Sequence, residues 1–147
     1  MLYFTGLKKQ KDSVIAIKNR YQLDCFKAED GTLHPLNFSQ LPFMPKRFFM
    51  VSGCEVNEKR GNHAHYLCKT FLFCASGTID VTLNDGTNEY THDLKKGEGV
   101  FVDRLVWDSQ VYKEKDSILI AFCSIEYEPN DYIEDFEQFK KIVQRPK

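Results

Sequence analysis

The sequence predicts an all-β domain, a sandwich or barrel that ends in one short helix. Short stretches rich in β-branched and aromatic residues recur at roughly 8–12-residue spacing, with turn signals between them. Hydrophobic residues near the C-terminus change to helical spacing instead. The chain of 147 residues suits a single domain over residues 1–147, long enough to bury a core.

The N-terminal part reads as an extension over residues 1–20 followed by a hairpin. Its segments with strand character are residues 13–17, 21–26 and 33–38. The run Glu29-Asp30-Gly31-Thr32 predicts the turn between the last two. Pro35 favours an edge position or an exchanged strand, because proline cannot donate to a ladder. Residues 41–45 then break regular structure, so residues 21–38 are candidates for exchange with a second subunit.

The middle of the chain predicts the body of the sheet structure. Further strands are expected at residues 47–52, 70–75, 78–83, 88–94, 100–102, 105–107 and 117–125. The first and the last of these are nearly continuously apolar, which predicts buried strands. Asp85-Gly86 is typical of a tight hairpin turn, because these residues tolerate positive φ.

The C-terminal segment predicts one amphipathic helix that packs on the sheet. Asn130 is its expected N-cap. Apolar residues then follow at near-helical spacing, namely Tyr132, Ile133, Phe136, Phe139 and Val143. Core packing accounts for this stripe.

Composition narrows the possible functions. A net charge of -1 gives no electrostatic basis for binding nucleic acid or an anionic membrane. No apolar run approaches the roughly 18 residues of a membrane span. The five cysteines form no CxxC pair, and Cys74 and Cys123 lie in apolar runs as small buried hydrophobes. We therefore expect a protein of the reducing cytoplasm.

The stretch Arg60-Gly61-Asn62-His63-Ala64-His65 is the strongest candidate for a functional site. Two histidines one residue apart on an extended segment lie on the same face of a strand. They are expected where irregular chain enters the sheet, and such junctions often carry functional residues. A bare His-x-His pair is also compatible with surface or core histidines.

The surrounding spacing adds a resemblance to a known fold. His63-x-His65 followed by Thr70 is similar to the first cupin motif, in which a glutamate stands in the place of Thr70. Gly97 begins a counterpart of the second motif, in which Asp108 occupies the place of the histidine. The resemblance implies a cupin jelly roll. Thr70 cannot replace a carboxylate, so we expect no metal and no other cofactor, although His63, His65 and Asp108 leave a two-histidine, one-carboxylate face as an alternative.

A finer match extends over about residues 23–143. Its segments are Asp30-Gly31-Thr32-Leu33, Leu41-Pro42-Phe43, Lys46-Arg47, the histidine stretch, Leu83-Asn84-Asp85-Gly86, Val106-Trp107, Tyr127 and Asp131-Tyr132-Ile133 with Phe139. These resemble the WxcM-like cupins, which include dTDP-4-keto-6-deoxyglucose 3,4-ketoisomerases. The resemblance implies an isomerase that moves the ketone of a dTDP-linked 4-keto-6-deoxyhexose from carbon 4 to carbon 3. It also implies a place in deoxyamino-sugar biosynthesis for surface polysaccharide such as lipopolysaccharide.

The sequence departs from that family at the expected pocket walls. Phe48 and Phe49 stand where members often carry tyrosine, and Asp108 stands where they usually have histidine. The common glutamine before the central strand corresponds to Lys69 or Thr70. These departures bear on the identity of the substrate.

Ketone migration needs a base that takes the proton from carbon 3. It also needs a group that transfers a proton at the oxygens of carbons 3 and 4. Histidine suits both tasks, because its pKa lies near neutral. We assign His63 as the base and His65 as its partner, an order that sequence alone leaves reversible. Developing negative charge on oxygen also needs a donor or cation.

Four further residues are candidates for substrate binding. Arg47 and Arg60 are expected to bind the diphosphate, because guanidinium groups match phosphate oxygens bidentately. Trp107 is expected to wall the pocket or stack on a ring, with core packing as the alternative. Asp108 is expected to bind a sugar hydroxyl, orient a histidine or face water.

The leading prediction is thus a metal-independent sugar-nucleotide 3,4-ketoisomerase. The alternatives are a sugar-nucleotide epimerase, a metal-dependent cupin, and a catalytically silent cupin that binds a nucleotide sugar or a protein. We also expect a homodimer, because a jelly roll has open edges and residues 41–45 separate the N-terminal hairpin from the barrel.

Overall fold

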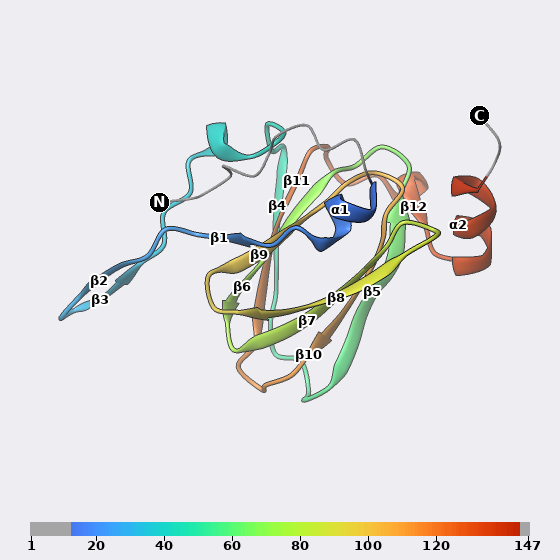
Figure 1. The fold of residues 1–147 in the computed structure, drawn as a ribbon. Helices are drawn as coiled ribbons and strands as arrows, with labels where there is room; N and C mark the ends of the chain where they lie inside the picture. The colour runs from blue at the N-terminus through green and yellow to red at the C-terminus, as the bar shows by residue number, and fades with distance from the viewer. Residues whose placement is uncertain (1–12, 145–147) are drawn as a thin grey trace.

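Two antiparallel sheets face each other in the computed structural model, which describes residues 13–144 (Figure 1). The first sheet has the order β1 (Tyr21–Gln22), β9 (Glu98–Val102), β6 (Thr70–Ser76), β11 (Ile118–Cys123) and β4 (Arg47–Val51). The second has the order β12 (Tyr132–Ile133), β5 (Glu58–His65), β10 (Trp107–Tyr112), β7 (Thr78–Asn84) and β8 (Glu89–Lys95). The all-β prediction is therefore confirmed.

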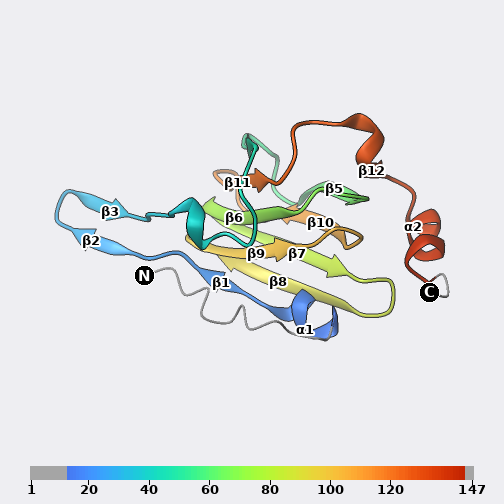
Figure 2. The same ribbon diagram turned by 90° about the horizontal axis from the view of Figure 1, so that it is seen from above.

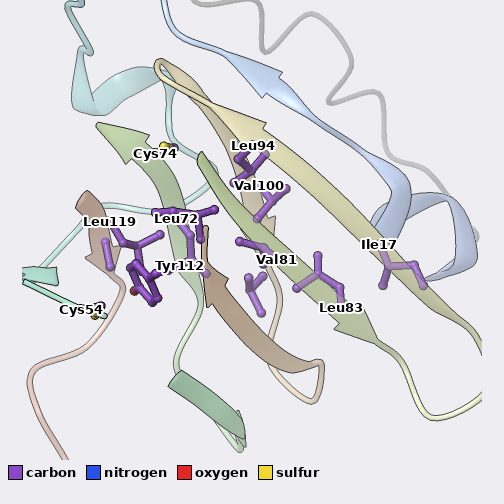
Figure 3. Packing of buried hydrophobic residues seen from close by; sticks show 13 residues of the cluster. Ile17, Cys54, Leu72, Cys74, Val81, Leu83, Leu94, Val100, Tyr112 and Leu119 are labelled. Atoms are coloured by element: carbon purple, nitrogen blue, oxygen red, sulfur yellow. The ribbon is translucent and has the colours of Figure 1, made fainter. Parts of the chain in front are cut away.

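The core lies between the two sheets. Alternate residues of β7 and β11 are buried, as expected where one face of a strand meets the core. Figure 3 shows Leu72 and Leu119 of the first sheet in the same cluster as Val81 and Leu83 of the second. This packing fixes the strands that carry the functional residues.

The hairpin of β2 (Phe26–Ala28) and β3 (Gly31–Leu33) projects away from both sheets (Figures 1 and 2). Its turn is where the sequence predicts it. The strand predicted at residues 33–38 is wrong, because pairing ends at Leu33 and a 3-10 helix, η1 (Phe38–Gln40), follows. All residues of β2 and β3 are exposed, including the large side chains of Phe26 and Leu33.

The N-terminal edge strand predicted at residues 13–17 is also wrong. These residues lie in a short helix, α1 (Ser13–Lys18). The helix buries Ile17 in the core, and the Ile17 carbonyl lies 2.6 Å from Nε2 of the buried His92. A short apolar run has no periodicity of its own that separates helix from strand. Residues 1–12 of the expected extension lie outside the described residues.

Three expectations for the middle strands need correction. Strand β4 is an edge strand rather than a buried one, with Phe48 54% and Met50 58% exposed. Leu105 has a φ of 58° and belongs to a turn, so the strand expected at residues 105–107 begins only at Trp107 and runs on to Tyr112. Strand β11 is fully buried on alternate residues and only partly on the others.

The C-terminal helix α2 (Phe136–Val143) exists but begins later than predicted. Its N-cap is Asp135, whose carboxylate accepts a hydrogen bond from Gln138 N. Asn130 lies instead in a 3-10 turn, η2 (Pro129–Asp131). The fully buried Phe139 anchors the helix, as predicted. None of the helices in residues 13–144 is both long and apolar enough to cross a membrane.

Candidate active site

A bulge in β5 brings Arg60 and His63 to the same face of the sheet. Three residues separate them along a strand whose side chains alternate, so a regular strand would place them on opposite faces. Arg60 pairs with Gln110 and His63 with Asp108, which are two residues apart on β10. The additional residue, Asn62, has a φ of 61° and takes up the difference.

Gly61 makes this bulge possible. Its φ is 77°, a region that glycine adopts without steric cost. A Cβ atom at this position would lie 3.0 Å from Oδ1 of Asp108 and 3.1 Å from Nε2 of Gln110. The glycine therefore permits both the backbone conformation and the close approach of β10.

His63 and His65 lie side by side on β5, rather than at a junction before the strand. Their ring centroids are 5.0 Å apart. The ring of Tyr132 on β12 packs against both, at 5.2 Å from His63 and 4.4 Å from His65. Between them on the opposite face, Ala64 is fully buried under Ile133 and Phe139. Packing on both sides of β5 thus fixes the two imidazoles.

The buried carboxylate of Asp131 contacts His65. His65 Nδ1 lies 3.1 Å from Asp131 Oδ2. Burial and the neighbouring His63 lower the pKa of His65, and the Asp131 carboxylate opposes that shift. His65 is therefore mainly neutral at neutral pH, which is the state that can accept a proton.

Asp108 lies beside His63 on the neighbouring strand, β10. Its Oδ2 lies 3.6 Å from His63 Nε2, beyond normal hydrogen-bond distance, and its Oδ1 accepts a 2.7 Å hydrogen bond from Gln110 Nε2. The hydroxyl of Tyr112 in turn donates to Gln110 Oε1 at 3.0 Å. Burial raises the pKa of Asp108, and the charge of His63 opposes that shift.

A pocket of about 310 Å³ opens in front of these groups. It is lined by Arg47, Phe49, Met50, Val51, Arg60, Gly61, His63, His65, Thr70, Gln110 and Tyr132. The guanidinium of Arg47 lies 5.0 Å from the ring of Phe49 and 4.9 Å from that of Tyr127, which holds its charge in place. The pocket thus combines two arginines with two histidines.

Four of the six residues expected at the site line this pocket, namely Arg47, Arg60, His63 and His65. Asp108 is buried directly behind His63. Trp107 lies elsewhere, because its ring packs on Phe136 and Phe139 of α2 at 5.2 and 5.6 Å. Trp107 therefore packs in the core, which was the alternative to a place in the pocket wall.

Sequence reasoning missed several residues of the site. The family resemblance includes Asp131 and Tyr132, but the apolar spacing predicts Tyr132 within a helix and Asp131 beside its N-cap. Nothing in the local sequence indicates that Asp131 is buried, because its position follows from the pairing of β12 with β5. The sequence assigns no role to Gln110, whose place follows only from strand register. Thr70, in the place of the cupin glutamate, lines the pocket.

The ligand set predicted as an alternative, His63, His65 and Asp108, does not form a metal centre. Such a centre needs three or four ligands that converge on one point. Within residues 13–144 the potential ligand atoms that lie within 4.8 Å of one another belong to His65, Cys68 and Asp131, not to the predicted alternative set. Both Asp131 oxygens already accept N–H groups.

Facing antiparallel sheets with a histidine-lined pocket define a cupin, as the motifs predict. Residues 16–144 match the model of the WxcM-like, C-terminal family, and the chain belongs to that family. It is 31% identical over 105 residues to the TDP-4-oxo-6-deoxy-alpha-D-glucose-3,4-oxoisomerase of Aneurinibacillus thermoaerophilus, a match that covers 70% of this chain and 75% of the relative.

Solved structures agree with this assignment. A 3,4-ketoisomerase from Helicobacter canadensis superposes with a TM-score of 0.80 at 26% identity, over 86% of this chain and 97% of that one. A histidine-to-asparagine mutant of the 3,4-ketoisomerase from Thermoanaerobacterium thermosaccharolyticum, in complex with TDP-4-keto-6-deoxyglucose, also reaches 0.80. Its identity is 20%, and the match covers 86% of this chain and 93% of that one. The family-model match therefore confirms the predicted family, and these superpositions agree with the predicted fold.

Proposed function

We propose that the protein is a sugar-nucleotide 3,4-ketoisomerase that acts on a dTDP-linked 4-keto-6-deoxyhexose. The observation that carries this proposal is the histidine pair, 5.0 Å apart in one pocket with Arg47 and Arg60. The named activity of the curated relative supports it. The complex of the Thermoanaerobacterium enzyme supports a TDP-linked keto sugar as the ligand class.

The reaction moves two protons and no other atoms. His63 takes the proton from carbon 3, which is acidified by the adjacent ketone, and the electron pair forms an enediolate across carbons 3 and 4 with its negative charge on the oxygen of carbon 4. His63 exchanges this proton with water and then returns a proton to carbon 4. His65 takes the hydroxyl proton from the oxygen on carbon 3 and gives it to the oxygen on carbon 4. Each positioned proton transfer of this kind contributes about 10²–10⁴ in rate.

The two arginines suit the diphosphate end of the substrate. Arg47 is braced by two aromatic rings, and Arg60 lies on the same face of β5 as His63. Guanidinium forks match phosphate oxygens better than lysine does. Gripping the non-reacting diphosphate would hold carbons 3 and 4 beside the imidazoles, which is how remote binding promotes reaction.

Proton NMR of dTDP-4-keto-6-deoxyglucose with the protein in deuterated water tests this function. We expect a new keto sugar to appear, with deuterium on carbon 4. Because His63 and His65 supply the proton transfers, we expect the rate to survive a metal chelator. Binding without conversion would instead support the silent cupin, and loss of turnover on chelation would support a metal-dependent enzyme.

We also propose that two copies form a homodimer by exchanging their N-terminal hairpins. The hairpin exposes Phe26 and Leu33, and edge strand β4 exposes Phe48 and Met50. Exposed apolar side chains and an open sheet edge both favour association. Light scattering at micromolar concentration should give the dimer mass, and a monomer there would contradict the proposal. The free state of all five cysteines fits a reducing compartment such as the cytoplasm.

A further inference from the structure

Asp131 holds the most fully hydrogen-bonded carboxylate beside the pocket. Only 5% of the residue is exposed. Oδ1 accepts from Leu67 N at 2.8 Å, and Oδ2 accepts from Cys68 N at 3.1 Å. Its own carbonyl oxygen accepts from Tyr66 N at 3.0 Å. The segment after β5 thus clamps this side chain, and the remaining contact of Oδ2 is with His65 Nδ1 at 3.1 Å.

This contact selects one tautomer of His65. An ionised carboxylate only accepts hydrogen bonds, so the ring nitrogen that faces it must carry the hydrogen. We propose that Asp131 is a positioning residue that holds His65 as the Nδ1–H tautomer and leaves Nε2 as the proton acceptor of the pocket. The inference rests on the proposed function, because it specifies the role of His65 in that reaction.

The tautomer matters for the oxygen-to-oxygen proton transfer. Nε2 of neutral His65 can accept the hydroxyl proton from the oxygen on carbon 3, and the resulting imidazolium is stabilised by Asp131. Nε2–H then donates the same proton to the oxygen on carbon 4, which restores neutral His65. With the other tautomer Nε2 already carries a hydrogen and cannot begin this cycle.

Several groups around His65 set the pH at which the cycle works. Burial lowers the pKa of His65, as does the neighbouring His63 on β5, whereas Asp131 and Asp108 raise it. The Tyr132 ring packs on its face, and Cys68 lies near its Asp131 contact. Removing the Asp131 carboxylate should therefore lower the pKa of His65 further. The acid limb of the activity profile should move to lower pH.

Asp131→Asn tests the proposal, with Asp135→Asn as the matched control. The asparagine can still accept from a backbone N–H, but its amide group would donate to His65 Nδ1 and favour the Nε2–H tautomer. We expect kcat to fall by about 10²-fold or more, with KM little changed, because His65 would then be held in the tautomer that cannot accept the proton. Asp135 also accepts from a backbone N–H, Gln138 N at 2.7 Å, but lies outside the pocket lining, so its variant should keep wild-type kcat.

A second measurement does not depend on activity or on the variant folding. Nitrogen-15 NMR of the wild-type protein near neutral pH should show His65 Nδ1 protonated and Nε2 unprotonated. A protonated Nε2 in the wild type would overturn the proposal, as would Asp131→Asn with wild-type kcat and an unmoved acid limb. If the wild type has the expected tautomer but converts no keto sugar, the proposed function fails while the positioning contact stands.

Discussion

The two pocket histidines each face an aspartate, and the two aspartates are held in different ways. Asp131 is fixed by two backbone N–H groups and lies 3.1 Å from His65. Asp108 is fixed by the side chain of Gln110 and lies 3.6 Å from His63. One contact is a hydrogen bond and the other is a looser electrostatic pair. The two histidines of one strand thus have different environments.

The difference agrees with the division of work proposed above. His63 is the more exposed ring, with 24% of its side chain exposed against 10% for His65. A base that takes a proton from carbon and exchanges it benefits from a reachable, less constrained ring. A group that carries a hydroxyl proton between two oxygens benefits from a fixed tautomer. Variants of each pair can separate these roles.

His63→Asn should have the largest effect. Asparagine keeps a polar group of similar reach but cannot accept a proton near neutral pH. We expect turnover to fall by about 10²-fold or more, because the general base is lost. Exchange of the carbon 3 proton with deuterated water should be lost as well, and proton NMR measures both.

The control for this variant is retained ligand binding with an unchanged circular dichroism spectrum. Those results would separate lost chemistry from lost fold. Wild-type turnover in His63→Asn would mean that the base lies elsewhere, with His65 as the first residue to examine.

His65→Asn should be impaired in a different way. If His65 serves only the oxygens, His63 can still remove the carbon 3 proton. We expect product formation to fall by about 10²-fold while deuterium still enters at carbon 3. The ratio of exchange to product, measured in one NMR time course, is the readout. Equal losses of exchange and product would reverse the assignment of the two histidines.

Much of this site follows from the sequence. The spacing of His63 and His65 predicts their shared face, and the surrounding motif predicts the fold and family. Arg47 and Arg60 line the pocket, as expected, and their binding of a diphosphate stays a prediction that rests on the fit of guanidinium to phosphate. Local patterns were sufficient for these inferences because strand alternation and turn chemistry act over a few residues.

The rest depends on contacts between distant segments. The Asp131–His65 contact joins residues 66 positions apart. Residues 130–133 have apolar spacing that suits a helix, but pairing of β12 with His65 and Ala64 overrides it. The bulge at Gly61 and Asn62 could not be predicted from the sequence either, because the positive φ of Asn62 follows from the register with β10. Trp107 shows the converse, a family motif residue that packs on α2 instead of lining the pocket.

Asp108→Asn should have the smallest effect on rate. It should lower kcat slightly but raise the stability of the fold. The looser 3.6 Å pair suggests a loss of about tenfold in kcat, or roughly 1.4 kcal/mol.

Burial raises the pKa of Asp108, so its contribution to stability is present below the unfolded pKa and is lost as pH rises through the folded pKa. At neutral pH the neutral amide should therefore be the better buried group, while its oxygen can still accept from Gln110. We expect a gain of roughly 1 kcal/mol, or about 2–4 °C in Tm. Thermal unfolding at pH 7 and at pH 4 checks this, since the gain should shrink at the lower pH. A lower Tm at pH 7 would mean that the Asp108 charge stabilises the fold through His63.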